Sequence, residues 1–206
     1  MLIKHRDSEP LIDPSVFVAP NAVVVGRVTV RANSRIIYGA VLNSEGSKIE
    51  IGEYNIICEN TVLRASSFGD QEYPVVIGDH VFVSPQSTLL GCTIESCTYI
   101  ATGATVLQGS TVHSGAVVAV GAFVHAKTVI PEGTFIPPNN IAIGNPLRIF
   151  SPDEKNALTD AIRSIGFAKI AFNVDAQWED RLTRYKQATE VRSKEFENHF
   201  NDLIIK

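Results

Sequence analysis

The chain has 206 residues, of which 45% are hydrophobic and 19% are charged, and its formal net charge is −4 at pH 7. This composition is typical of a globular protein, and the length is sufficient for one sizeable domain with an appendage. The acidic balance excludes the broad positive surface with which proteins bind nucleic acid or an anionic membrane.

The first residues, MLIKHRDSEP, lack the apolar segment of a signal peptide. No apolar run approaches the roughly 20 residues that a membrane-spanning helix needs. The three cysteines, Cys58, Cys92 and Cys97, have no CxxC spacing, which favours reduced thiols over disulfides. We therefore expect a cytoplasmic protein.

A six-residue repeat runs through the first 150 residues or so. In its longest stretch every sixth residue is aliphatic, namely Ile94, Ile100, Val106, Val112, Val118, Val124, Ile130 and Ile136. The residue four positions after each of the first seven is small: Thr98, Ala104, Ser110, Ala116, Ala122, Thr128 and Thr134. A strict period of six fits neither an α-helix nor an alternating strand. It predicts a solenoid in which three hexads close one triangular coil of about 18 residues.

Three irregularities interrupt the repeat. About three residues are inserted within 42–51 and two within 63–77, whereas the step across 89–94 is five residues. The segment RASSFGDQEYP, residues 64–74, is expected to leave the coil. Excursions from one edge of a solenoid frequently carry function.

The repeat ends near residue 150, where SPDE predicts the start of a helix. Ser151 would be its N-cap, Pro152 its first residue and Glu154 its third, and Gly166 would end it. The apolar stripe of this helix would be Leu158, Ala161, Ile162 and Ile165.

A second helix is expected from about Ala176 to near the C-terminus. Its apolar residues include Trp178, Leu182, Tyr185, Phe196 and Phe200. The chain is thus expected to consist of a β-helix domain, 1–150, and a helical extension, 151–206, that packs on it and covers open sheet edges. Alternatively, the extension recruits a partner protein.

Several segments together carry a family resemblance: YGAVLNSE, IEIGEYNIICENTVLRAS, VVIGDHVFVSPQSTLLGCTI, ATGATVLQGSTV and IAIGNPLRIFSPDE. Over about residues 10–165 the chain resembles the γ-class carbonic anhydrases, a family of hexapeptide-repeat proteins. The resemblance implies an all-β solenoid, a left-handed parallel β-helix, followed by C-terminal α-helices. It also implies a homotrimer with zinc sites between adjacent subunits.

The family's three zinc-ligand histidines correspond to Arg64, Pro85 and Leu90 of this chain. None of these side chains can bind Zn²⁺. The neighbouring positions also differ, with NSE at 43–45 in place of an RGD-like segment and CE at 58–59 in place of QD. We therefore expect a site without metal or cofactor, and no zinc-dependent CO₂ hydration by the family mechanism.

Arg64 is the main candidate in the altered site. Its planar guanidinium could bind the carboxylate or phosphate of a small anionic or acyl ligand at the subunit interface. Alternatively, it pairs with Glu59 or Glu45 and only holds the trimer together. The candidate ligand-binding residues are Asn43, Glu45, Glu59, Arg64, Pro85, Gln86 and Leu90.

The candidate catalytic residues are Arg64, Glu59, Cys58 and His80. Cys58 has no histidine placed to activate it, which favours a small buried residue over a nucleophile. Many hexapeptide proteins are acyltransferases with a histidine base. His80 neighbours the excursion and is the best placed for that role, although it, His113 and His125 are all expected at the surface.

Two function classes remain open from sequence. One is a ligand-binding or transferase-like protein, and the other is a non-catalytic structural or assembly protein. A third alternative is a hydratase or other metalloenzyme with relocated ligands such as Cys58, Cys92, His80 or Glu59. The expected partners are two further copies of the chain and a small anion or acyl compound, without nucleic acid or membrane.

Overall fold

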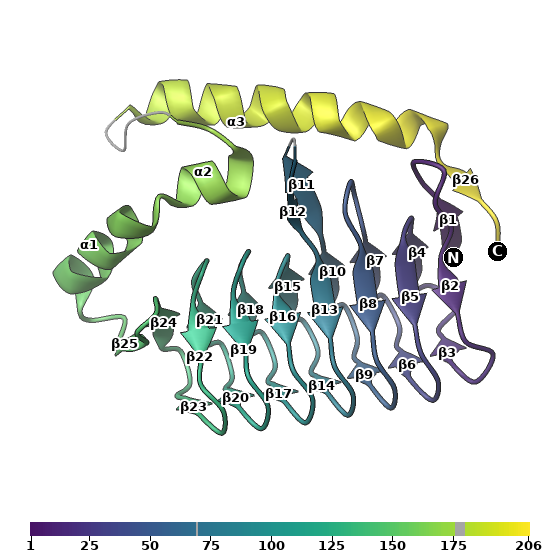
Figure 1. Cartoon of the computed structure of the whole chain (residues 1–206), viewed down its shortest axis with the longest axis horizontal. Coiled ribbons are helices and arrows are strands. Elements are labelled where there is room, and N and C mark those ends of the chain that lie inside the picture. Colours follow the sequence, from purple (N-terminus) through teal and green to yellow (C-terminus); the bar gives the residue numbers. More distant parts are fainter. Residues whose placement is uncertain (69, 176–179) are drawn as a thin grey trace.

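The structure is a computed structural model that describes residues 1–68, 70–175 and 180–206. Most of the chain winds into a parallel β-solenoid, a left-handed β-helix with triangular coils (Figure 1). Thr105 pairs in parallel with Phe123, and Thr111 with Val129, each one coil and three hexads later. The predicted fold class is therefore confirmed.

Three sheets form the walls in the described part of the chain. Sheet I consists, in spatial order, of β25 (Arg148–Phe150), β24 (Ile141–Ile143), β21 (Phe123–Val124), β18 (Thr105–Val106), β15 (Thr88–Leu90), β10 (Val62–Arg64), β7 (Val41–Asn43), β4 (Val23–Val25), β1 (Leu2–Lys4) and β26 (Leu203–Ile204). Sheet II consists of β2 (Leu11–Ile12), β5 (Val28–Val30), β8 (Ile49–Ile51), β13 (Val75–Ile77), β16 (Thr93–Ile94), β19 (Thr111–Val112) and β22 (Val129–Ile130). Sheet III consists of β23 (Phe135–Ile136), β20 (Val117–Val118), β17 (Tyr99–Ile100), β14 (Phe82–Val83), β9 (Ile56–Ile57), β6 (Arg35–Ile36) and β3 (Phe17–Val18).

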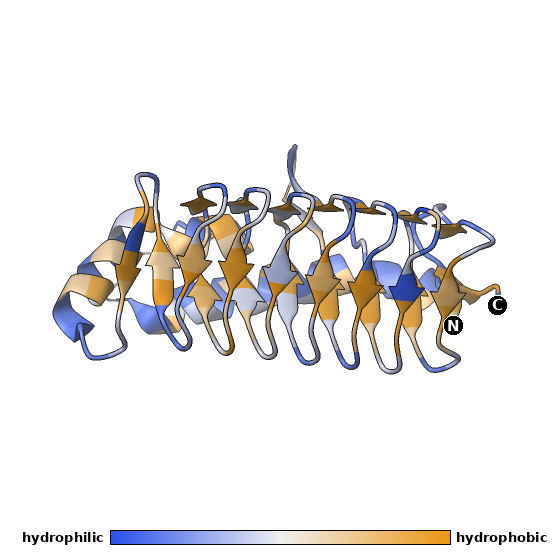
Figure 2. Ribbon diagram, turned by 90° about the horizontal axis from the view of Figure 1, so that it is seen from below, coloured by the Kyte–Doolittle hydropathy of each residue, from blue (hydrophilic) through white to orange (hydrophobic). Residues whose placement is uncertain are grey.

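The core is the stack of inward aliphatic side chains. All eight hexad residues from Ile94 to Ile136 are 0% exposed. Figure 2 shows the result as hydrophobic strands joined by mostly hydrophilic corners. Burial of each such side chain contributes about 1.5–3 kcal/mol to stability, so the repeat itself supplies the driving force for coiling.

The predicted excursion is a β-hairpin, formed by β11 (Ser66–Phe68) and β12 (Gln71–Tyr73), which pair antiparallel. It rises from the solenoid beside sheet I (Figure 1). Gly91, at the five-residue slip, has a φ of 49°, and a Cβ there would lie 2.6 Å from the Cβ of Tyr73. Glycine at the slip therefore lets the returning hairpin pack against the coil.

The first helix, α1 (Lys155–Ile165), starts later than expected. The backbone N–H of Ser151 does bond to the Glu154 carboxylate, at 2.7 Å, but Glu154 has a ψ of 50° and lies outside the helix. The SPDE segment thus closes a turn before the helix. Gly166 ends α1 in the left-handed conformation, as predicted. The predicted apolar stripe packs on Ile143 and Phe150 at the end of the solenoid.

The second helical segment differs more from expectation. A short helix, α2 (Phe167–Phe172), packs on the outer face of sheet I through Phe167 and Ile170 and was not anticipated. The long helix α3 (Arg181–Phe196) continues into the 3₁₀ helix η1 (Glu197–Asn201). Ala176 and Trp178 lie outside the described residues.

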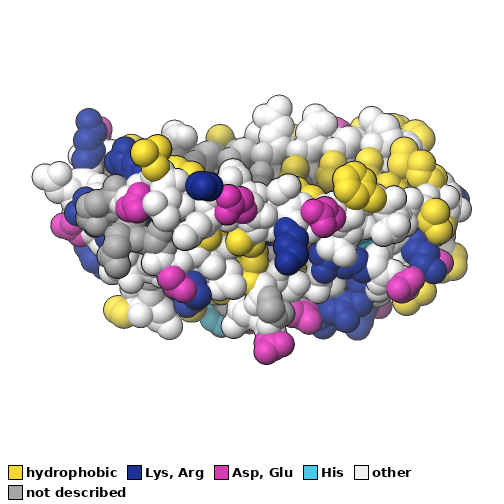
Figure 3. Space-filling model, turned by 90° about the horizontal axis from the view of Figure 1, so that it is seen from above, with side chains coloured by type: hydrophobic (Ala, Val, Ile, Leu, Met, Phe, Trp, Pro, Cys, Tyr) yellow, Lys and Arg dark blue, Asp and Glu magenta, His cyan; other side chains and the backbone are white. Residues whose placement is uncertain are grey.

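Helix α3 runs along the length of the solenoid, and the strand after it, β26, pairs antiparallel with β1 (Figure 1). Leu182 and Phe200, expected on an apolar face, are each 88% exposed. Figure 3, seen from the α3 side, shows hydrophobic side chains scattered among charged ones. No helix of the described residues is both long enough and apolar enough to cross a bilayer.

Candidate functional site

Arg64, the last residue of β10, lies at the corner between sheets I and II. Its Nη2 donates a hydrogen bond to Glu45 Oε1 at 2.9 Å, and its Cζ lies 4.9 Å from the ring centroid of Phe196 on α3. The Arg64 side chain is 31% exposed, whereas that of Glu45 is 1% exposed. The predicted pairing with Glu45 is therefore present within one chain.

A cavity of about 430 Å³ opens beside Arg64, between the outer face of sheet I and helices α2 and α3. Its apolar wall includes Val62, Leu90, Phe167, Phe172 and Phe196. Besides Arg192, three polar side chains, Arg64, Ser66 and Gln108, also line it.

Each of these three polar side chains has a buried atom without a hydrogen-bond partner among the described residues. The atoms are Arg64 Nε, Ser66 Oγ and Gln108 Oε1. Buried polar atoms are normally paired, so three unpaired ones in side chains that line one cavity mark it as a candidate site. A second arginine of the wall, Arg192, is already engaged by Glu195 and the Ala171 carbonyl.

On the other side of Arg64, Glu45 belongs to a second polar group. Asn43 Nδ2 donates to Glu45 Oε1 at 2.8 Å, and His199 Nε2 lies 3.3 Å from the same oxygen. His5, Glu45 and His199 each offer a potential metal-ligand atom within 4.8 Å of the others. Among the described residues, this is where His, Cys, Asp or Glu side chains converge closely enough for an ion.

Asp202 connects the two histidines of this group. Burial lowers the pKa of His199, but hydrogen bonds to Asp202 and Glu45 and their charges more than offset this, so the pKa is raised. Burial likewise raises the pKa of Asp202, but hydrogen bonds from His199 and His5 outweigh it, so that pKa is lowered.

The other predicted site residues lie elsewhere. Cys58, Glu59, Pro85 and Gln86 occupy the corner between sheets III and I, at the opposite edge of sheet I from Arg64. Burial and then the charge of Glu59 raise the pKa of the Cys58 thiol, which disfavours a thiolate nucleophile.

His80 turns the chain between sheets II and III, with its ring stacked 5.1 Å from that of Tyr54. His125, expected at the surface, is buried because α2 covers it, and its ring lies 5.3 Å from that of Phe167.

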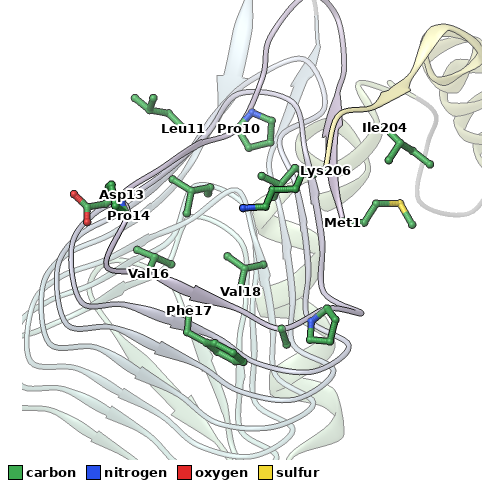
Figure 4. A pocket seen from close by; sticks show the side chains of 14 residues that line it. Met1, Pro10, Leu11, Asp13, Pro14, Val16, Phe17, Val18, Ile204 and Lys206 are labelled. Atoms are coloured by element: carbon green, nitrogen blue, oxygen red, sulfur yellow. The ribbon is translucent and has the colours of Figure 1, made fainter.

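A larger cavity, of about 830 Å³, lies at the open N-terminal end of the solenoid (Figure 4). Its lining side chains are mostly apolar and include Leu11, Val16, Phe17 and Val18. They expose the core of the first coil rather than a set of converging polar groups. We therefore place the candidate site at Arg64.

Comparison with known proteins agrees with this fold. The chain is similar to a "Probable carbonic anhydrase" of Methanocaldococcus jannaschii, with 41% identity over 139 residues that cover 68% of this chain and 81% of that protein. This chain belongs to the γ-class carbonic anhydrase-like family. No family model matches it.

Other members of the γ-class family are also similar. The mitochondrial γ carbonic anhydrase 1 of Arabidopsis thaliana is 36% identical over 116 residues, 52% of this chain and 42% of that protein. The chain thus spans less than half the length of that relative. A solved hexapeptide transferase family protein of Anaplasma phagocytophilum has 23% identity and a TM-score of 0.48, and the alignment covers 95% of this chain and 96% of the other. The cytoplasmic location stays a prediction.

The three positions that correspond to the family's zinc ligands lie at two different edges of sheet I. Arg64 and Leu90 are register partners on the adjacent strands β10 and β15. Pro85 lies at the opposite edge. Sequence reasoning found Arg64 and Glu45 but missed His5, His199 and Asp202, because the 197 positions between His5 and Asp202 leave no spacing pattern to recognise.

Proposed function

We propose that this γ-class relative binds a small carboxylate with an apolar body in the Arg64 cavity. The observation that carries the proposal is the set of three buried polar atoms without a partner, Arg64 Nε, Ser66 Oγ and Gln108 Oε1, in side chains that line one cavity. A ligand carboxylate would accept from Arg64 Nε and Ser66 Oγ. The aromatic rings of α2 and α3 would enclose the apolar part, as is usual for ligand pockets of 300–1,000 Å³.

The proposal includes loss of the family's zinc site. Arg64, Pro85 and Leu90 do not fit a zinc ion, since a guanidinium cannot be deprotonated and the other two side chains have no donor atom. No reaction step is therefore assigned to zinc at these positions. CO₂ hydration by the family mechanism is not part of the proposed function.

Binding, rather than acyl transfer, is the function that the cavity supports. The described residues that line it include no histidine, cysteine, aspartate or glutamate. A transferase of the hexapeptide type needs a base within hydrogen-bond reach of its acceptor. His80, the base considered from sequence, turns a different corner of the coil.

We further infer a homotrimer. Exposed aromatic side chains follow sheet III and its corners: Phe17, Tyr38, Tyr54, Phe82, Tyr99 and Phe135. Such a row is unusual on a monomer and fits burial against a second copy. A neighbour would also bring its Pro85 and Gln86 corner to the Arg64 edge, as the family arrangement requires.

A structural or assembly role is the second candidate. Two observations favour this role. Arg64 is already paired with Glu45, and the C-terminal segment exposes the apolar residues Leu182, Tyr185 and Phe200. In that case Arg64 stabilises the subunit, and the exposed residues contact another protein.

A binding screen tests the proposal. Isothermal titration calorimetry would compare hexanoate and phenylacetate with the matching neutral amides, using the wild-type protein, Arg64→Met and the control Arg27→Met. We expect the carboxylates to bind wild type and Arg27→Met at least about tenfold more tightly than Arg64→Met, because Arg64 lines the cavity and Arg27 does not. Absence of binding, or equal binding to acids and amides, would favour the assembly role.

A further inference from the structure

Three parts of the chain that are far apart in sequence meet on the Glu45 side of Arg64. His5 comes from the turn after β1, Glu45 from the turn after β7, and His199 from η1. His5 and Glu45 are 1% and 3% exposed. Buried ionisable side chains are rarely gathered without a charge-balancing partner, so the group needs an explanation.

The hydrogen bonds to Asp202 determine which ring nitrogen of His5 and of His199 carries a hydrogen. His5 Nδ1 lies 2.6 Å from Asp202 Oδ1, and His199 Nδ1 lies 2.8 Å from Oδ2. Because an ionised carboxylate only accepts hydrogen bonds, both Nδ1 atoms carry a hydrogen. In the neutral rings the Nε2 atoms are then free lone-pair donors. A carboxylate behind the ring is how metal-binding histidines are held in proteins.

Two atoms of the group, one on His5 and one on Glu45, lack hydrogen-bond partners among the described residues. His5 Nε2 and Glu45 Oε2 are both buried without a hydrogen-bond partner in the described part of the chain. His199 Nε2 lies 3.3 Å from Glu45 Oε1, a contact that either a proton on the ring or a bound cation satisfies. Arg64 and Asn43 already donate to Oε1, which leaves Oε2 for that cation.

We propose that His5, Glu45 and His199 bind a divalent transition-metal ion of the Zn²⁺ class, and that Asp202 orients both histidines. Two imidazoles and one carboxylate with an open position form a donor set that such ions use. With metal–ligand distances of about 2.0–2.2 Å, ligand atoms of a tetrahedral ion lie roughly 3.4 Å apart. The present separations, up to 4.8 Å, would have to contract, and the His5 and His199 rings, stacked with their centroids 4.3 Å apart, would have to turn so that both Nε2 lone pairs point at one ion.

An entrance to the proposed ion site is present. A polar cavity of about 150 Å³ is lined by His5, Glu45, Ser44, Ser47 and the arginines Arg6 and Arg27. It is large enough for a metal ion with water. Glu72, which pairs with Arg27, lines the same cavity, so its walls carry both positive and negative side chains.

The proposed ion is distinct from the family's zinc and independent of the carboxylate cavity. None of its three ligands is Arg64, Pro85 or Leu90, and none lines the cavity beside Arg64. The proposal replaces the sequence-based expectation of a metal-free protein. It also differs from the relocated ligands considered from sequence, because Cys58, Cys92, His80 and Glu59 are not in the group.

Equilibrium dialysis of the untagged full chain against Zn²⁺, followed by elemental analysis, tests the site. We expect one Zn²⁺ per chain in wild type, at least about 100-fold weaker binding in His199→Gln, and about 10–100-fold weaker binding in Asp202→Asn. The matched control is His113→Gln, since His113 Nδ1 also lies 2.9 Å from a carboxylate, that of Glu95, but belongs to no three-ligand group among the described residues. This control should bind as wild type does.

Two results would overturn the proposal: no stoichiometric Zn²⁺ in wild type, or equal binding in wild type and His199→Gln. Mg²⁺ binding as tight as that of Zn²⁺ would also overturn it, because Mg²⁺ avoids imidazole ligands. A thermal shift provides a second readout, with Zn²⁺ stabilising wild type and His113→Gln but not His199→Gln. Arg64→Met, which should lose carboxylate binding, should retain Zn²⁺, so the two proposals fail separately.

Discussion

Arg64 and Glu45 form one ion pair that separates two candidate sites. The contact between Arg64 Nη2 and Glu45 Oε1 is 2.9 Å long. Arg64 lines the cavity under α2 and α3, while Glu45 belongs to the histidine group, and neither Arg64 Nε nor Glu45 Oε2 has a hydrogen-bond partner among the described residues. The pair therefore joins the cavity to the histidine group, although the two share no ligand-binding side chain.

Arg64→Met should destabilise the protein by about 1–3 kcal/mol, because it removes a charged donor from the buried Glu45 carboxylate. Arg27→Met is the matched control, since the Arg27–Glu72 pair is exposed on both sides and should contribute at most about 1 kcal/mol. Urea denaturation of both variants and wild type measures the difference. Equal losses would mean that the Arg64 pair contributes no more than a surface contact.

Leu89→Ala should cost about 2–5 kcal/mol, since Leu89 is an inward hexad residue with no exposed surface and the coil cannot close around the void. Its neighbour on β15, Thr88, points outward and provides the control, with Thr88→Ala expected within about 0.5 kcal/mol of wild type. Thermal unfolding of the two variants tests the inward phase of the hexad. Similar losses of stability in the two variants would contradict the assignment of Leu89 to the inward position and of Thr88 to the outward one.

His125 should make stability fall in acid. Burial lowers the pKa of His125 in the folded protein, although a hydrogen bond with the Ala126 backbone partly opposes this. Below the unfolded pKa of about 6.5 the unfolded chain therefore binds more protons, and stability decreases as the pH falls toward the folded pKa. Above that window the histidine is neutral in both states and contributes no pH dependence.

His125→Leu removes this titration and retains an apolar side chain against Phe167. The difference in free energy of unfolding between wild type and variant should change with pH between neutrality and mild acid, with the variant losing less stability. The comparison isolates His125 from the other histidines. A constant difference over that range would show that the ring is hydrated in the folded state.

Phe82→Glu should shift the inferred trimer toward monomer, because a charge in the middle of the sheet III aromatic row opposes burial against another copy. Leu182→Glu, on the exposed surface of α3, is the control and should leave the assembly unchanged. Sedimentation velocity of both variants at several concentrations gives the result. A trimer that persists in Phe82→Glu places the subunit contact elsewhere.

The solenoid was predictable from sequence because its physical cause is local and periodic. An aliphatic residue at every sixth position, as from Ile94 to Ile136, specifies both the strand and the corner of each hexad. Helix boundaries were less accurate: one bond expected of a capping box, from Ser151 N–H to the Glu154 carboxylate, forms, but it closes a turn instead. Strand β26 could not be foreseen, since two apolar residues acquire a partner only once α3 has returned to β1.

The candidate site was predictable only where a family position marked it. Arg64, Glu45 and Asn43 do lie together, because β7 and β10 are adjacent in sheet I. Ser66 and Gln108 gave no signal, since a serine in a hairpin and a glutamine at a corner are ordinary surface residues. Their burial depends on α2 and α3, whose packing on sheet I is not encoded in any local pattern.

The pairing of β26 with β1 changes how the molecule should come apart. In an open repeat array each coil touches only its neighbours, so the end coils fray independently. Here α3 leads the chain from the last coil back to the first, and Ile204 pairs with Ile3 in the same sheet (Figure 1). The described chain is closed into a ring of contacts, so the first coil should open together with the C-terminal helix.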